Sequence, residues 1–131
     1  MDILAAKTAG MYQRAMVAEM PSIEEIRVSD IRPGAAEEYA EQMHAELGVQ
    51  VTPCAKNEEA CRNADIIITV TIANEPLVMR DWLKKGCTVL SLGSFQELDE
   101  NIPLHCDKLI VDSWAQNAHR DNLDAFGETE Q

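Results

Sequence analysis

The feature of this sequence that most restricts its fold is the apolar run DIIITVT at residues 65–71. Three consecutive isoleucines cannot all face one side of a β-strand, because successive side chains of a strand point to opposite faces. A strand of this kind is buried on both faces, as in a parallel sheet covered by helices on each side. The run therefore predicts an inner strand of an α/β fold.

Segments of strand and helix character alternate along the rest of the chain. Further strands are expected at about 3–4, 23–29, 49–52, 87–94 and 108–113. Helices are expected at 10–20, at 35–47 ending at Gly48, at 56–64 with Asn57 as N-cap, at 79–85 ending at Gly86, and from Trp114 to about 126. The pattern predicts a single Rossmann-like domain over 1–131, a three-layer α/β fold. Its mostly parallel, doubly wound sheet would have about six strands with helices on both faces, and 127–131 would be a frayed tail.

Composition excludes several classes of function. The chain has 131 residues and a formal net charge of −12, which disfavours binding to nucleic acid because the phosphates would be repelled. No apolar run approaches the roughly 20 residues of a membrane helix, and the first residues do not resemble a signal peptide. We therefore expect a cytoplasmic protein that does not bind membranes.

The four cysteines do not predict a metal site. Cys54, Cys61, Cys87 and Cys106 fall outside any C-x-x-C spacing, whereas a zinc site normally takes two ligands from one short turn. We expect reduced thiols that behave as small apolar side chains.

Small and polar residues follow the predicted strands at their carboxyl ends, where doubly wound sheets bind ligands. The first strand leads into the turn at 5–10 and the second into Asp30. The remaining positions are Thr69, Val70, Thr71, Gly93, Ser94, Asp112 and Ser113. Because parallel strands end at one edge, the sequence predicts a ligand site along that edge.

Asp30 has the position of an acid that binds the ribose of adenosine. It follows Gly10 by 20 residues and comes directly after a strand. A carboxylate there would repel a 2′-phosphate, so NAD is expected rather than NADP. Ile31 and Arg32 follow in the same turn, and the arginine could instead accept a phosphate. An aspartate that simply suits the turn D-I-R-P-G is the alternative.

The turn at 5–10 is a poor match to the dinucleotide fingerprint G-x-G-x-x-G. Ala5 and Lys7 stand at the first two glycine positions, and Gly10 alone is retained. A side chain at position 7 would obstruct the approach of a pyrophosphate, although the charge of Lys7 could partly compensate. The turn is therefore either a weakened pyrophosphate site or a lead-in to the first helix.

Four segments together resemble the dinucleotide-binding domain of the ornithine cyclodeaminase/μ-crystallin family. They are PSIEEIRVSDIRP, ACRNADIIITVT, EPLVMRDWLKKGCTVLSLGS and DKLIVDSWAQNAHRDNL. The resemblance implies binding of NAD(H), with 5–10 at the pyrophosphate, Asp30 at the adenosine ribose and Thr69–Thr71 beside the nicotinamide. It also implies oxidation of an amino acid to an imine, or the reverse, in a protein more than twice as long.

The resemblance fails at one catalytic position. Cyclodeaminases carry an aspartate after the fifth strand, and Phe95 stands in its place within GSFQELDEN. The phenylalanine ring cannot transfer a proton, so no catalytic residue is assigned. Glu97 or Asp99 could replace the aspartate only if the loop folded differently.

Two functional hypotheses follow. The chain could be the NAD(H)-binding domain of an amino-acid oxidoreductase or deaminase, unable to turn over an amino acid or imine without a substrate domain. It could instead be a degenerate interaction module that no longer binds nucleotide. A face that would otherwise contact the substrate domain makes a homodimer one expected outcome.

Overall fold

The computed structural model describes residues 2–5, 10–71, 73–93, 95–113 and 115–116. The strands are β1 (Asp2–Ala5), β2 (Glu25–Val28), β3 (Gln50–Pro53), β4 (Ile66–Thr69) and β5 (Thr88–Ser91). The helices are α1 (Gly10–Glu19), α2 (Ala35–Leu47), α3 (Asn57–Cys61) and α4 (Asn101–His105), with short 3-10 segments η2 (Arg80–Trp82) and η3 (Phe95–Glu97).

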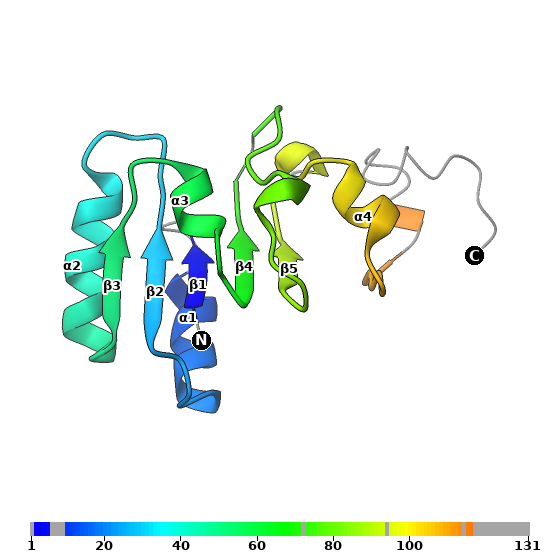
Figure 1. The fold of residues 1–131 in the computed structure, drawn as a ribbon. Coiled ribbons are helices and arrows are strands. Elements are labelled where there is room, and N and C mark those ends of the chain that lie inside the picture. The colour runs from blue at the N-terminus through cyan, green and yellow to red at the C-terminus, as the bar shows by residue number, and fades with distance from the viewer. Residues whose placement is uncertain (1, 6–9, 72, 94, 114, 117–131) are drawn as a thin grey trace.

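The described strands form one parallel sheet in the order β3-β2-β1-β4-β5. All the arrows therefore point the same way in Figure 1. The chain moves outward from β1 to β3, then returns to add β4 on the other side of β1. This reversal is the topological switch point of a Rossmann fold, and it places β1 and β4 side by side.

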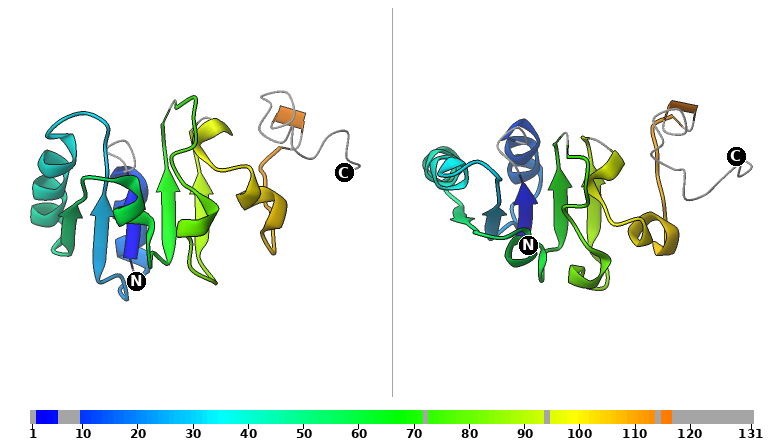
Figure 2. Two further views of the ribbon diagram at one scale, coloured as in Figure 1. Left: turned by 45° about the horizontal axis from the view of Figure 1, so that its top comes forward. Right: turned by 90° about the horizontal axis from the view of Figure 1, so that it is seen from above.

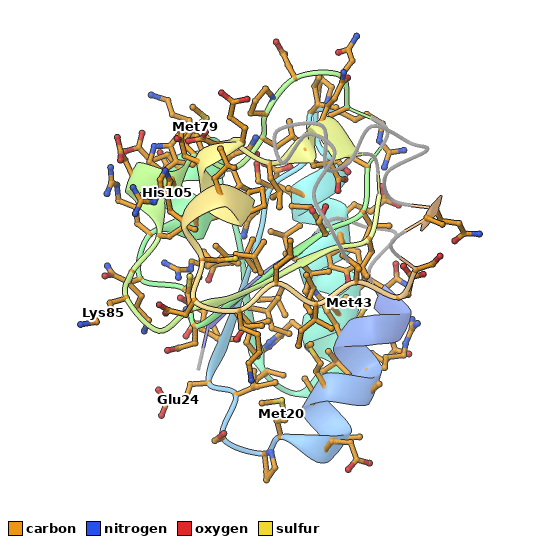
Figure 3. The ribbon with its side chains drawn as sticks, turned by 90° about the vertical axis from the view of Figure 1, so that its right-hand side faces the viewer. Met20, Glu24, Met43, Met79, Lys85 and His105 are labelled. Carbon is orange, nitrogen blue, oxygen red and sulfur yellow. The ribbon has the colours of Figure 1, made fainter. Side chains whose placement is uncertain are left out.

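Helices cover both faces of the sheet, as the sequence predicts. Viewed from above in Figure 2, α1 and α2 lie on one side of the strands and α3 lies on the other. Figure 3 shows the same division from the β5 side: Met43 of α2 lies on one side, while Met79 and His105 lie on the opposite side. The layers are thus helix, sheet and helix.

Each face of the sheet has its own apolar core. Ile66 and Ile68 pack with Ile26, Tyr39 and Met43 on the α2 side. A second cluster lies on the α3 side and contains Ala60, Cys61, Ala64, Ile67, Val78 and Ile102. Every residue of β4 is buried, so the prediction of a strand covered on both faces is confirmed. Each isoleucine so buried stabilises the fold by roughly 1.5–3 kcal/mol.

Helix α2 has the predicted bounds because glycine ends it. Gly48 has φ +70°, a left-handed conformation that costs glycine little, and its N–H donates to the carbonyl of His44 at 2.9 Å. On the inner side, Ala36, Tyr39, Ala40 and Met43 are buried at helical spacing.

Several predicted elements differ from the structure. Residues 108–113 are not a strand, so the described sheet has five strands where about six were predicted. These residues favour β-structure, but none of the described strands pairs with them, and Ile110 is 81% exposed. The helix expected at 79–85 is reduced to η2. Asn57 is the first residue of α3 rather than its N-cap. The predicted C-terminal helix beyond residue 116 lies outside the described residues.

Candidate functional site

The ends of the parallel strands bring most of the predicted site residues to one edge, here called the carboxyl edge. Ala5 ends β1, Asp30 follows β2, Thr69 ends β4 and Gly93 follows β5. Val70 and Thr71 continue from β4, and Gly10 is the first residue of α1, the element that follows β1. This edge is the upper one in Figure 1. Lys7 and Ser94 lie outside the described residues.

Asp30 is held in a tight turn by Arg32. The Asp30 carboxylate accepts hydrogen bonds from the backbone N–H of Arg32 at 2.9 Å and from its Nη2 at 3.2 Å. The Asp30 side chain is 10% exposed and that of Arg32 is 62% exposed. This hydrogen bond and the charge of Asp30 raise the pKa of the Arg32 guanidinium above its ordinary value. The arginine thus covers the carboxylate from the solvent side.

Ile31 lies between these two residues and is 98% exposed. An isoleucine this exposed gains none of the stabilisation that burial of its apolar surface would give. It offers an apolar surface at the end of β2, beside a carboxylate that accepts hydrogen bonds.

Glu97 occupies the part of the carboxyl edge that β4 and β5 form. Its side chain is 0% exposed although it is ionisable. One carboxylate oxygen accepts hydrogen bonds from the Thr69 hydroxyl at 2.8 Å, the Ser91 hydroxyl at 3.1 Å and the Gly93 N–H at 3.2 Å. The other accepts a short hydrogen bond from the N–H of Thr71. Hydrogen bonds to a buried carboxylate offset the cost of removing it from water.

The backbone of Glu97 is fixed as well. Its carbonyl accepts hydrogen bonds from the N–H groups of Leu77 at 2.7 Å and Val78 at 3.2 Å. Segments 69–71, 77–78 and 91–93, which are distant in sequence, therefore all bind to this one residue. Glu97 holds the ends of β4 and β5 together.

Gly93 is required by the same contacts. A Cβ atom built on Gly93 would collide with the backbone of Thr71 and with the carboxylate of Glu97. Only glycine allows the chain after β5 to approach the chain after β4 so closely. The predicted role of Gly93 at a ligand site is untested, but its role in this packing is evident.

Sequence reasoning considered Glu97 only as a replacement for a catalytic aspartate and missed its structural partners. Its carboxylate is buried under the strand ends rather than presented to a substrate. The signal that could have pointed to these partners is the spacing, because Glu97 follows Gly93, the glycine after β5, by only four residues. Asp99 is different: it accepts hydrogen bonds from the N–H groups of Arg80 and Asn101. Those from Asn101 and Arg80 lower the pKa of Asp99 below its ordinary value.

The cysteines are free thiols in the structure. Burial raises the pKa of Cys61 to about 12. Across the part of the chain that the structure describes, no group of His, Cys, Asp and Glu side chains is arranged to hold a metal ion. Within the same ranges, none of the helices combines the length and apolar character needed to cross a bilayer.

Comparisons with known proteins agree with this architecture. Ketimine reductase mu-crystallin of Macropus fuliginosus is 31% identical over 115 residues, which are 85% of this chain and 35% of that protein. A solved structure of Δ1-pyrroline-2-carboxylate reductase of Thermococcus litoralis, in complex with NADH and L-proline, is 31% identical. It has a TM-score of 0.67 and covers 76% of this chain and 32% of that one.

A dimeric archaeal alanine dehydrogenase with bound NAD has the same fold, with a TM-score of 0.81 at 24% identity. The match covers 95% of this chain and 40% of that one. The chain spans about a third of the length of the curated relatives it matches. The model of the ornithine cyclodeaminase/mu-crystallin family matches residues 3–129. This chain therefore belongs to the ornithine cyclodeaminase/mu-crystallin family.

Proposed function

We propose that this chain binds NAD(H) and is the cofactor domain of an oxidoreductase that acts on an amino acid or an imine. The observation that carries the proposal is the position of Asp30. It follows β2 at the carboxyl edge of a sheet whose strand order reverses beside β1. Its two oxygens already accept hydrogen bonds there. The relatives named for reduction of imines support the substrate class.

The adenosine end of the cofactor is proposed to lie over β2. The Asp30 carboxylate would accept hydrogen bonds from the ribose hydroxyls, which would replace its contact with Arg32 Nη2. The exposed side chain of Ile31 would cover one face of the adenine ring. A 2′-phosphate would be repelled by Asp30, so NAD is preferred over NADP in this proposal.

The pyrophosphate is proposed to lie at the turn between Ala5 and Gly10. Helix α1 begins at Gly10 and is ten residues long. The free N–H groups and the dipole of a helix N-terminus favour a bound phosphate. Lys7 would add a positive charge but also bulk.

The nicotinamide end is then proposed to lie over β4 and β5, near Val70, Thr71 and Ser94. The Thr69 hydroxyl and the N–H groups of Thr71 and Gly93 already bind Glu97. Thr69 and Gly93 would therefore shape this end of the site rather than donate to the cofactor. When bound, the nicotinamide ring accepts or gives up a hydride. A second wall is needed to hold the substrate, so we expect binding without turnover by this chain alone.

Calorimetric titration of the chain with NADH tests the proposal, with nicotinamide fluorescence as a second readout. We expect weak binding that Asp30→Ala reduces by about tenfold or more, as for loss of a hydrogen bond to a charged group. Asp65→Ala is the matched control, because Asp65 is also ion-paired, to Lys84, but precedes β4 at the opposite edge. The absence of binding at millimolar NADH would overturn the proposal.

The pyrophosphate position has its own test. Lys7→Gly and Ala5→Gly would restore the glycines of the fingerprint, and we expect each to tighten NADH binding. Unchanged affinity in both variants would place the pyrophosphate elsewhere.

A further inference from the structure

The carboxylate of Glu97 is a buried negative charge that has no counter-charge among the residues that the structure describes. Its four hydrogen bonds come from two hydroxyls and two backbone N–H groups. Among the residues that the structure describes, no Lys or Arg side chain makes an ion pair with it. In each of these hydrogen bonds the carboxylate of Glu97 is the acceptor.

This charge lies directly beneath the surface of the carboxyl edge. The Glu97 side chain is 0% exposed, yet its partners Ser91 and Gly93 are exposed residues. An electrostatic field acts more strongly from a buried charge than from a solvated one, because water screens it less. A ligand group that binds over the ends of β4 and β5 would therefore be affected by Glu97 without touching it.

The inference rests on the proposed function. With Asp30 at the adenosine ribose, the dinucleotide crosses the switch point from β2 towards β4, and its nicotinamide lies on the half of the sheet that contains Glu97. The nicotinamide ring carries a positive charge in NAD+ and none in NADH. A fixed negative charge below it stabilises the first form only.

We propose that Glu97 sets the preference of this site between the oxidised and reduced cofactor, in favour of NAD+. Glu97 acts here as a positioning residue as well, since it holds Thr69 and Thr71 of one strand end against Ser91 and Gly93 of the other. The two roles are separable by experiment. Loss of positioning weakens both forms of the cofactor, whereas loss of the charge changes their ratio.

Glu97→Gln removes the charge and retains the size of the side chain. The hydroxyls of Thr69 and Ser91 can turn to accept from the new amide, and the amide oxygen can still accept from Thr71. Only the hydrogen bond from Gly93 is lost. We expect the ratio of Kd for NAD+ to Kd for NADH to rise by on the order of tenfold, as for loss of one Coulombic contact in a partly buried site.

Asp99→Asn is the matched control. It removes the same charge two residues away, where the carboxylate binds Arg80 and Asn101 instead of the strand ends. We expect the ratio of the two dissociation constants to remain that of the wild type. Both constants are measured by calorimetry on the full chain, with circular dichroism to show that each variant is folded.

Three outcomes decide the inference. An equal loss of affinity for both forms in Glu97→Gln would leave only the positioning role and overturn the charge proposal. A wild-type chain that binds neither form would overturn the proposed function itself, and this inference with it.

If Glu97→Gln does not fold, Leu92→Lys at low ionic strength replaces it. Leu92 is 43% exposed at the end of β5, and an added positive charge there is expected to raise the same ratio several-fold. An unchanged ratio would overturn the charge proposal.

Discussion

The Thr69 hydroxyl donates a hydrogen bond to the Glu97 carboxylate at 2.8 Å, joining the end of β4 to a residue 28 positions later in the chain. Thr69 is 5% exposed and Glu97 is 0% exposed. The hydroxyl at the end of this strand is therefore bound within the protein. This hydrogen bond connects the end of β4 to the segment that follows β5.

The stability of the carboxyl edge is predicted to depend on this carboxylate. Glu97→Ala leaves the N–H groups of Thr71 and Gly93 without their acceptor and is expected to cost roughly 2–5 kcal/mol in the free energy of unfolding. Glu97→Gln loses one of these bonds and is expected to cost about 1–3 kcal/mol. Urea denaturation monitored by circular dichroism measures both. Equal stability of wild type and Glu97→Ala would contradict the packing described here.

Two glycines are predicted to respond differently to alanine. At Gly93 an added Cβ would collide with the backbone of Thr71, so Gly93→Ala is expected to cost about 3 kcal/mol. Gly86 has φ +86° and nothing within 4 Å of the added atom. Gly86→Ala should therefore cost only the left-handed strain, about 1–2 kcal/mol. Thermal melts of both variants check the order, and a larger loss at Gly86 would show it to be wrong.

Arg32 is predicted to influence the choice between NAD and NADP. Its guanidinium is exposed and lies against Asp30, where a 2′-phosphate would be placed by the proposed function. Arg32→Ala should lower the affinity for NADPH more than that for NADH. We expect the ratio to change by no more than about fivefold, since water and salt screen an exposed charge pair. Competitive titration with both cofactors measures it. A larger loss for NADH would refute this placement of the ribose.

Tyr39 is predicted to stabilise the contact between α1 and α2. Its hydroxyl donates to Oε1 of Gln13, whose side chain is 0% exposed. Tyr39→Phe leaves that oxygen without its donor in a buried position and is expected to cost about 1–3 kcal/mol at neutral pH. Gln13→Leu in the same background should recover part of the loss. A Tyr39→Phe variant as stable as the wild type would exclude a contribution from this bond.

The same residue predicts a pH dependence. Burial raises the pKa of Tyr39 from its ordinary value of 10.0 to about 12. The folded protein therefore keeps the phenolic proton between about pH 10 and 12, whereas the unfolded chain loses it. The contribution of Tyr39 to stability is present below pH 10 and is lost as the pH rises through this range. The free energy of unfolding, measured from pH 9 to 12, should fall less steeply with pH in Tyr39→Phe than in the wild type.

Local sequence determined the elements whose signals are self-contained. The isoleucines of β4 cannot be placed on one face, so they required a sheet buried on both sides, and that is where they lie. Gly48 ends α2 because only its conformation matters there. The position of Asp30 after β2 followed from strand and turn character alone. In each case the deciding interaction lies within a few residues.

The tertiary structure decided what depends on neighbours distant in sequence. Residues 108–113 have the composition of a strand, but a strand forms only where another strand accepts its hydrogen bonds, and Leu109 and Ile110 remain exposed. Glu97 lies in the segment GSFQELDEN, whose composition is that of a solvated loop. Only the parallel arrangement of β4 and β5 brings Thr69, Thr71 and Gly93 around its carboxylate and makes it the buried centre of the carboxyl edge.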